Sequence, residues 1–185
     1  ESLGMEREII SPVHSVTIGF DMKPVGRAAF DFQGFTYYPR RIDDRYAYLT
    51  LFPVPGAMRA NFMVYREMTD PWFAMLRKTP REALLQLIPK LEQIIGPFEV
   101  TNQLWVRPAD LYQTKSVEKP GVVLVGDAFA TSCPAAGTGS GKVFTDVERL
   151  CNRYIPHWLV TDGMAASKVA GFYADPEKLA YDAFS

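Results

Sequence analysis

The residues best suited to ligand chemistry lie between positions 122 and 149, in the stretch VVLVGDAFATSCPAAGTGSGKVFTDVER. A short apolar run at 121–125 ends at Gly126 and Asp127. A buried strand over this run would place the Asp127 carboxylate beyond the C-terminal edge of a sheet, where open α/β folds bind ligands. The carboxylate is then placed to accept hydrogen bonds from the hydroxyl groups of a ribose or a ribityl chain.

A glycine-rich turn follows at Gly137-Thr138-Gly139-Ser140-Gly141, and a helix is expected to begin between position 139 and position 143. Glycines let the backbone approach a flat ligand closely. The first turn of a helix presents unpaired N–H groups and a positive dipole end, which favour an anion. The turn is not a dinucleotide GxGxxG fingerprint, because its last glycine comes one position early and no acidic residue follows on a second strand.

Each part has an ordinary structural explanation when it is taken alone. A Gly-Asp pair is common in turns at strand ends, and a glycine-rich segment is a common entry to a helix. The order of apolar strand, acidic turn, Gly-rich loop and helix favours a ligand site over two unrelated turns.

The elements that must position this site begin with a β-rich segment from Pro12 to Tyr65. Apolar and aromatic runs separated by turn residues predict strands at 13–22, 28–32, 35–38, 46–52 and 60–65. Asp43-Asp44 predicts an antiparallel hairpin between the third and fourth of these strands. We therefore expect an antiparallel sheet rich in aromatic side chains.

Helical signals begin at Asp70, where Pro71 suits the first helical position. Thr79 and Glu82 form a capping-box pattern for a second helix, which Pro89 should kink or end early. A strand over 98–106 is expected to return to the sheet, and short helices are expected over 157–184.

Composition favours a small-molecule ligand. The 185 residues are 48% hydrophobic, which allows a real core, and the formal net charge of −1 gives no electrostatic footprint for nucleic acid or an anionic membrane. The sequence shows no membrane span and no signal peptide. Cys133 and Cys151 are too few for a disulfide framework or a zinc site. We expect a cytoplasmic protein without a bound metal, and a homo-oligomer is left open.

The stretch 122–149 resembles the second FAD motif of the flavoprotein monooxygenases related to para-hydroxybenzoate hydroxylase. That family has an apolar strand, Gly-Asp-Ala, a loop with a proline, a Gly-x-Gly turn and a helix that carries an aspartate. The matching residues here are Gly126-Asp127-Ala128, Pro134, Gly137-Thr138-Gly139 and Asp146. The resemblance implies that Asp127 binds the ribityl or ribose part of FAD and that the Pro134 loop lies beside the isoalloxazine ring. It also implies that the helix after Gly139 points its N-terminus at the flavin pyrimidine ring.

The sequence departs from the family at two positions and in one whole segment. The family usually has His where Ala130 stands and Asn where Gly141 stands. No GxGxxG loop that would hold the FAD pyrophosphate occurs in these residues. The resemblance therefore implies the C-terminal part of such an enzyme, inactive by itself, with the N-terminal FAD-binding half as a missing partner.

The implied fold is α/β. Residues 1–115 are expected to form a mixed or antiparallel substrate-domain sheet with helices. Residues 116–155 are expected to form the final strand, Gly-rich loop and helix of an FAD-binding domain, and 156–185 a helical tail. Aromatic residues on the inner face of the sheet are candidates for a substrate pocket, although aromatics at strand spacing are more often core; the candidates are Tyr37, Tyr48, Phe52 and Phe62.

The implied activity is hydroxylation of an aromatic or other small organic substrate by an FAD-dependent monooxygenase that uses NADH or NADPH and oxygen. No side chain is assigned as a nucleophile. A reductase, dehydrogenase or halogenase with the same FAD fold is an alternative, because a shared fold does not separate these chemistries. A binding module without catalysis is the alternative from a different class.

Overall fold

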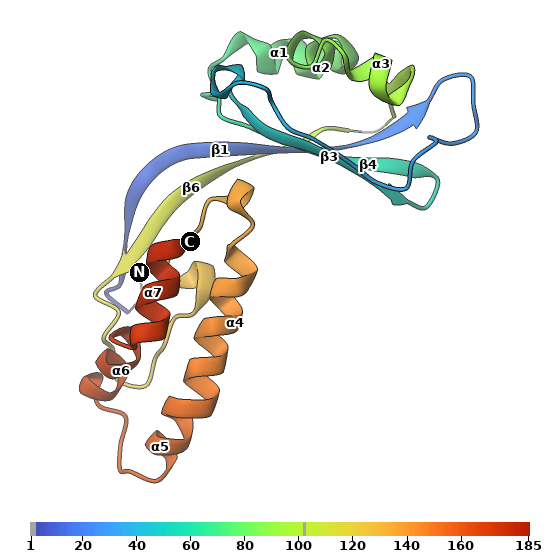
Figure 1. Cartoon of the computed structure of the whole chain (residues 1–185). Coiled ribbons are helices and arrows are strands. Elements are labelled where there is room, and N and C mark those ends of the chain that lie inside the picture. Colours follow the sequence, from blue (N-terminus) through green and yellow to red (C-terminus); the bar gives the residue numbers. More distant parts are fainter. Residues whose placement is uncertain (1–2, 102) are drawn as a thin grey trace. The chain divides into compact units, whose positions relative to one another are not determined.

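A computed structural model describes residues 3–101 and 103–185 of the chain (Figure 1). The chain divides into two compact units, one formed by Ser15–Ala109 and the other by the residues up to His14 together with Asp110–Ser185. The division falls within strands β1 (Glu6–Pro24) and β6 (Trp105–Lys115), which pair with each other. The sequence suggested a boundary near residue 115 and gave no sign that the first residues group with the last.

The unit Ser15–Ala109 is built on a sheet with one buried face. Strands β2 (Phe35–Tyr37), β3 (Tyr46–Val54), β4 (Ala57–Val64), β1 and β5 (Phe98–Val100) lie side by side in that order. Each of these neighbouring pairs is antiparallel. Every second residue of β4 is buried, as the two-residue period of a strand requires.

Three short helices cover the buried face (Figure 1): α1 (Pro71–Lys78), α2 (Pro80–Leu87) and α3 (Leu91–Ile95). Trp72 of α1 meets Phe62 of β4 with the ring centroids 6.1 Å apart. The expected fold class, an antiparallel sheet with helices in an α/β chain, is confirmed.

Most of the predicted strands of this unit are present, with two exceptions. Residues 28–32 form an irregular loop instead of a strand. In this loop the rings of Phe30 and Phe32 pack on each other, with their centroids 5.3 Å apart. The side chain of Arg27 donates to the carbonyl of Ile95 and so fastens this loop beside the end of α3. The predicted strand at 98–106 is two elements, β5 and the beginning of β6.

The helix signals were partly right. Asp70 caps α1 by accepting from the Trp72 N–H at 2.9 Å, and α2 ends at Leu87, two residues before Pro89. The predicted capping box is wrong, because the Thr79 hydroxyl donates back to the Met75 carbonyl of α1 at 3.3 Å instead of capping α2. In the part of the chain that is described, no helix has the length and apolar character needed to cross a membrane.

The other unit is mainly helical. It contains the 3₁₀ turns η2 (Gly126–Ala128) and η3 (Pro134–Ala136), helix α4 (Gly139–Arg149), the π-helical turn η4 (Leu150–Tyr154), and helices α5 (Ile155–Leu159), α6 (Ala166–Tyr173) and α7 (Pro176–Phe184). Phe129, Val169 and Phe172 are buried among these elements and supply its apolar core. Helix α4 begins where the sequence predicted.

The predicted strand at 121–125 is wrong, because these residues have no strand partner among the described residues. Val122 forms only an isolated bridge with Lys119, although Val125 has extended backbone angles. The backbone of Leu124 forms hydrogen bonds with the Tyr173 hydroxyl instead of with another strand. The hydroxyl accepts from the Leu124 N–H at 2.8 Å and donates to the Leu124 carbonyl at 3.4 Å. The segment is half-buried rather than buried on both faces.

Candidate functional site

The acidic turn packs directly on helix α4. Gly126 has a φ of 54°, and a Cβ at this position would come within 2.4 Å of Val143 Cγ2. The Gly126 N–H donates to Asp146 Oδ2 at 2.7 Å. Only glycine fits this left-handed and crowded position, so Gly126 serves to bring Asp127 close to the helix.

Asp127 has a fixed backbone and an exposed side chain. Its carbonyl accepts from the Tyr112 hydroxyl at 2.8 Å, and the carbonyl of Ala128 accepts from the Thr114 hydroxyl at 2.9 Å. Its carboxylate is exposed and pairs with no side chain among the described residues. The turn therefore presents a carboxylate that is available to a ligand.

The glycine-rich turn offers open backbone at the start of α4. Gly137 adopts the left-handed conformation with a φ of 69°, and a Cβ at Gly137 or Gly139 would meet nothing within 4 Å. The Lys142 N–H donates to the Thr138 carbonyl at 3.0 Å, so the N–H groups of 139–141 precede the helical ladder. A planar group has room to approach the backbone here.

Gly141 differs from these two glycines because it is covered. A Cβ at this position would lie 1.8 Å from the Tyr181 hydroxyl of α7. The sequence placed Gly141 with the ligand-binding glycines, whereas the structure gives it a packing role against α7. An Asn side chain, usual in the family that the motif resembles, could not stand beside Tyr181 without displacing it.

The loop between the two turns contains Pro134, which opens η3 and is half-buried. Thr138 donates from its hydroxyl to the Ser185 carbonyl at 3.4 Å, and Ser140 is exposed. Asp127, Pro134 and the turn 137–141 belong to one unit, in which Gly126 packs on Val143 of α4 and the Gly137 N–H donates to the Pro134 carbonyl at 3.3 Å.

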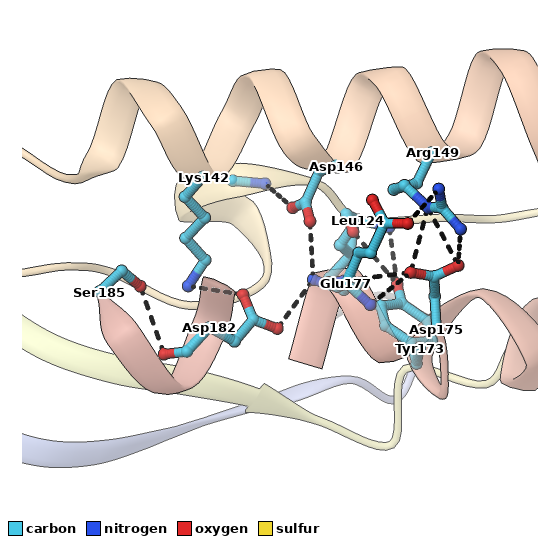
Figure 2. A network of polar contacts seen from close by, with 11 residues as sticks. Leu124, Lys142, Asp146, Arg149, Tyr173, Asp175, Glu177, Asp182 and Ser185 are labelled. Carbon is cyan, nitrogen blue, oxygen red and sulfur yellow. Dashed lines mark hydrogen bonds and ion pairs between the residues drawn. The ribbon is translucent and has the colours of Figure 1, made fainter. Parts of the chain in front are cut away.

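Two clusters of charged residues join α4 to α7 (Figure 2). In the first, Lys178 contacts Asp146 at 2.9 Å and Asp182 at 3.0 Å, and Lys142 lies 3.3 Å from Asp182. Lys178 is fully buried and Asp146 is 1% exposed. Removing one member of such a cluster leaves a buried charge without its partner, which is costly.

The second cluster surrounds Asp175, which caps the N-terminus of α7. Burial by itself would raise the pKa of Asp175, but hydrogen bonds from Arg149, the Lys178 N–H and Tyr154 lower it to about 2. Arg149 also pairs with Glu177 at 2.8 Å. The second cluster holds the end of α4 to the start of α7.

The four aromatic candidates lie on opposite sides of the sheet. Tyr37 stands opposite the buried Leu49, and Phe62 is itself fully buried, so both are on the helix-covered side. Burial and a hydrogen bond with Tyr37 help to raise the pKa of Tyr46 to about 12. Tyr48 and Phe52 stand opposite Met63 and Arg59, which alternate with the buried residues of β4, so both lie on the uncovered side. The structure does not bring the four into one pocket.

Sequence reasoning missed a polar and aromatic group on the same uncovered side. Arg59 forms an ion pair with Asp21 and lies over the Trp105 ring, 5.2 Å from its centroid. A Cβ at Gly19 would be 3.8 Å from the Trp105 ring. Phe52 stands opposite Arg59 in the register of β3 and β4. The strict alternation of β4 was the signal that could have found Arg59.

A cavity of about 460 Å³ in this unit is lined in part by residues of the turn between β3 and β4. Met22 and Met58, which are buried and paired in register, contribute to it together with Arg27, Phe30 and Phe32. None of the four predicted aromatic residues lines this cavity.

Among the residues that are described, no three His, Cys, Asp or Glu side chains gather as a metal ion would need.

No family model matches this sequence, and no curated protein matches it. Solved structures do match. The chain aligns over 100% of its length with 42% of the halogenase PltM, at 13% identity and a TM-score of 0.59. It aligns over 98% with 44% of p-nitrophenol 4-monooxygenase PnpA from Pseudomonas putida DLL-E4, at 18% identity and a TM-score of 0.57. It aligns over 95% with 31% of CmlS, a flavin-dependent halogenase, at 15% identity and a TM-score of 0.55.

The chain spans less than half the length of each of these three structures. At such low identities the likeness establishes the fold and leaves the activity open. The chain therefore has the fold of part of these enzymes, a group that includes halogenases and a monooxygenase.

Proposed function

We propose that this chain supplies one side of the FAD site of an FAD-dependent oxidoreductase, most specifically a monooxygenase that hydroxylates an aromatic or other small organic substrate. One observation carries the proposal: the exposed Asp127 carboxylate, the open backbone at Gly137 and Gly139 and the start of α4 occur together in one unit. The apolar segment, acidic turn, Gly-rich loop and helix follow in the order of the FAD motif that the sequence resembles.

The residues present fit such a cofactor. Glycines with nothing within 4 Å of a Cβ leave room for a flat ring system, and an exposed carboxylate suits a polyhydroxyl chain. In this proposal Asp127 accepts from the ribityl or ribose hydroxyls, the Pro134 loop lies along the ring, and the N–H groups at the start of α4 face the pyrimidine. Gly126 and Gly141 contribute by packing. When bound, FAD would supply the redox chemistry, with NADH or NADPH as reductant.

The uncovered side of the sheet is proposed as the substrate side. Tyr48 and Phe52 provide aromatic surface there, and the ion pair of Arg59 with Asp21 provides polar groups beside Trp105. Tyr37 and Phe62 are not proposed to bind substrate, because they lie on the helix-covered side of the sheet. The role of the chain's own residues is to orient the substrate and exclude water.

The remainder of the FAD-binding fold is proposed to come from a segment with a pyrophosphate-binding loop, since the structural relatives are more than twice as long as this chain. A cytoplasmic location is part of the proposal, and two free cysteines favour a reducing compartment.

A halogenase is the second candidate, favoured by PltM and CmlS among the similar structures. Incubating the complete protein with FAD, NADH or NADPH, oxygen, bromide and a panel of phenolic acids separates the two. A product heavier by one oxygen atom supports the monooxygenase, and a brominated product supports the halogenase. Bound flavin with neither product would favour a reductase or dehydrogenase, and no flavin binding at all would contradict the proposal.

A further inference from the structure

We propose that Lys178, on helix α7, is a positioning residue for the Gly126–Asp127 turn. The inference rests on the proposed function, because that function makes Asp127 a flavin ligand. It adds a part of the chain, the C-terminal helix, that the motif resemblance does not include.

The first connection from Lys178 to the turn runs through Asp146. Lys178 Nζ donates to Asp146 Oδ1 at 2.9 Å, and Asp146 Oδ2 accepts from the Gly126 N–H at 2.7 Å. One buried carboxylate thus joins an ammonium group on α7 to the backbone of the turn. Because the ammonium group holds one oxygen in place, the other oxygen stays directed at Gly126.

The second connection runs through Phe129. Lys178 Nζ lies 4.2 Å from the centroid of the Phe129 ring, and the Phe129 N–H donates to the Gly126 carbonyl at 3.0 Å. The ammonium group therefore attracts a ring that is fixed to the other side of the same turn. Both ends of the turn are tied to one buried cation.

The charge balance makes Lys178 hard to replace. Lys142 and Lys178 face Asp146 and Asp182, two positive charges against two negative charges in a buried setting. Without Lys178 the buried Asp146 carboxylate loses its ion-pair partner, because Lys142 contacts Asp182, so Asp146 must rotate or recruit water. Each of these changes alters the acceptor of the Gly126 N–H.

The second cluster supplies a matched control. Arg149 and Asp175 also join α4 to α7 with buried charges, at 2.9 Å, but neither touches the Gly126–Asp127 turn among the described residues. Breaking either cluster weakens the contact between the two helices. Only the Lys178 cluster also reaches the turn.

The test compares Lys178→Met with Arg149→Met in the full 185-residue chain. Both variants should lower the melting temperature. Only Lys178→Met should move the Gly126 amide signal in NMR spectra and speed its hydrogen exchange.

With the remainder of the FAD-binding fold supplied, Lys178→Met should weaken FAD binding by about tenfold, since a small misplacement of a positioning group costs up to about a hundredfold. Arg149→Met should stay within about twofold of the parent, less than the tenfold step of 1.4 kcal/mol.

A double-mutant cycle with Asp146→Asn checks the route. If Lys178 acts through Asp146, the shifts of the Gly126 amide caused by Lys178→Met and Asp146→Asn should be less than additive. Additive shifts, an unmoved Gly126 amide, or equal responses to Lys178→Met and Arg149→Met would overturn the inference.

Two further measurements cover the cases in which Lys178→Met does not fold or the parent protein binds no FAD. If Lys178→Met does not fold, Phe129→Leu removes the ring contact and keeps the ion pairs, and it should move the Gly126 amide in the same direction by less. If the parent protein binds no FAD, the proposed function fails, but the Gly126 amide still decides whether Lys178 positions the turn.

Discussion

Asp127 combines an exposed carboxylate with a backbone that its neighbours hold in place. The Tyr112 and Thr114 hydroxyls bind the carbonyls of 127 and 128, and Asp146 binds the N–H of Gly126. The backbone groups of the turn are thus held by structural hydrogen bonds, whereas the acidic side chain stays exposed. The sequence alone indicated the carboxylate but not the three groups that fix it, because they come from β6 and α4.

Replacing Asp127 by Ala should weaken FAD binding in the complete protein by about 1.5 to 3 kcal/mol, the range for a hydrogen bond to a charged group. The dissociation constant is measured by flavin fluorescence. Asp162→Ala, which removes another exposed carboxylate of the same unit, is the control and should leave the affinity unchanged. Equal affinities for the two folded variants would remove Asp127 from the site.

The stability of the chain should depend on Asp175 in acid. The pKa of Asp175 is about 2 against an ordinary 3.8, so its contribution is present above the ordinary value and is lost as the pH falls through about 2. The loss should be on the order of 2 kcal/mol. Urea unfolding between about pH 5 and pH 2 measures it.

The matched variant for this pH dependence is Arg149→Met, which takes away the main partner that lowers the pKa of Asp175. The free energy of unfolding of this variant should be lower near neutral pH and should change less on acidification. An unaltered pH dependence in Arg149→Met would show that the ion pair does not set the acid stability.

The aromatic candidates show where residue-level reading of a strand fails. Alternation over 46–52 correctly places Tyr48 and Phe52 on one side, but it also puts Tyr46 there. The bulge at 46–48 sends Tyr46 into the core instead. A bulge inserts one residue into the pattern, and its position depends on pairing with β4 rather than on the local sequence.

At the scale of elements, the helix α4 was predictable and the strand before it was not. The helix has its own start signal, the Gly-rich turn, and its first residue, Gly139, lies within the predicted range of 139–143. The run 121–125 has the apolar composition of a buried strand, but a strand also needs a hydrogen-bonding partner. The described residues supply the hydroxyl of Tyr173 instead, and no local pattern could have indicated that contact from 49 residues away.

The glycines of α4 should respond differently to substitution. Gly141→Ala places a methyl group 1.8 Å from the Tyr181 hydroxyl and should destabilise the chain by about 1 to 3 kcal/mol, as overpacking does. Gly139→Ala meets open space in the same helix and should be neutral or slightly stabilising. Thermal unfolding measures both.

A double variant tests the cause of this difference. Gly141→Ala combined with Tyr181→Ala removes the clash, so it should lose less stability than the two single variants together. Additive losses would mean that Tyr181 does not restrict position 141.

At the scale of the whole molecule, the chain carries one side of the proposed flavin site on a unit whose helix α4 exposes three apolar side chains. Val143, Phe144 and Val147 of α4 are 38%, 74% and 41% exposed. Exposed apolar side chains gathered on one helix are typical of a surface that another polypeptide covers.

Composition predicted a globular chain with a small-molecule ligand. The grouping of the first residues with 110–185 depends on pairing between distant strands, so no local pattern in the sequence indicated it.

The most direct test of the account is complementation of residues 1–185 with a polypeptide that carries the strand, GxGxxG loop and helix of the N-terminal FAD-binding half. Flavin retained after gel filtration is measured by absorbance. The chain alone should retain no stoichiometric FAD, because it offers only Asp127, the Pro134 loop and the start of α4. The complex should be yellow, with about one FAD per pair. If the added half is folded and bound and the complex still retains no flavin, the flavoenzyme account is contradicted and a binding module without catalysis becomes the better description.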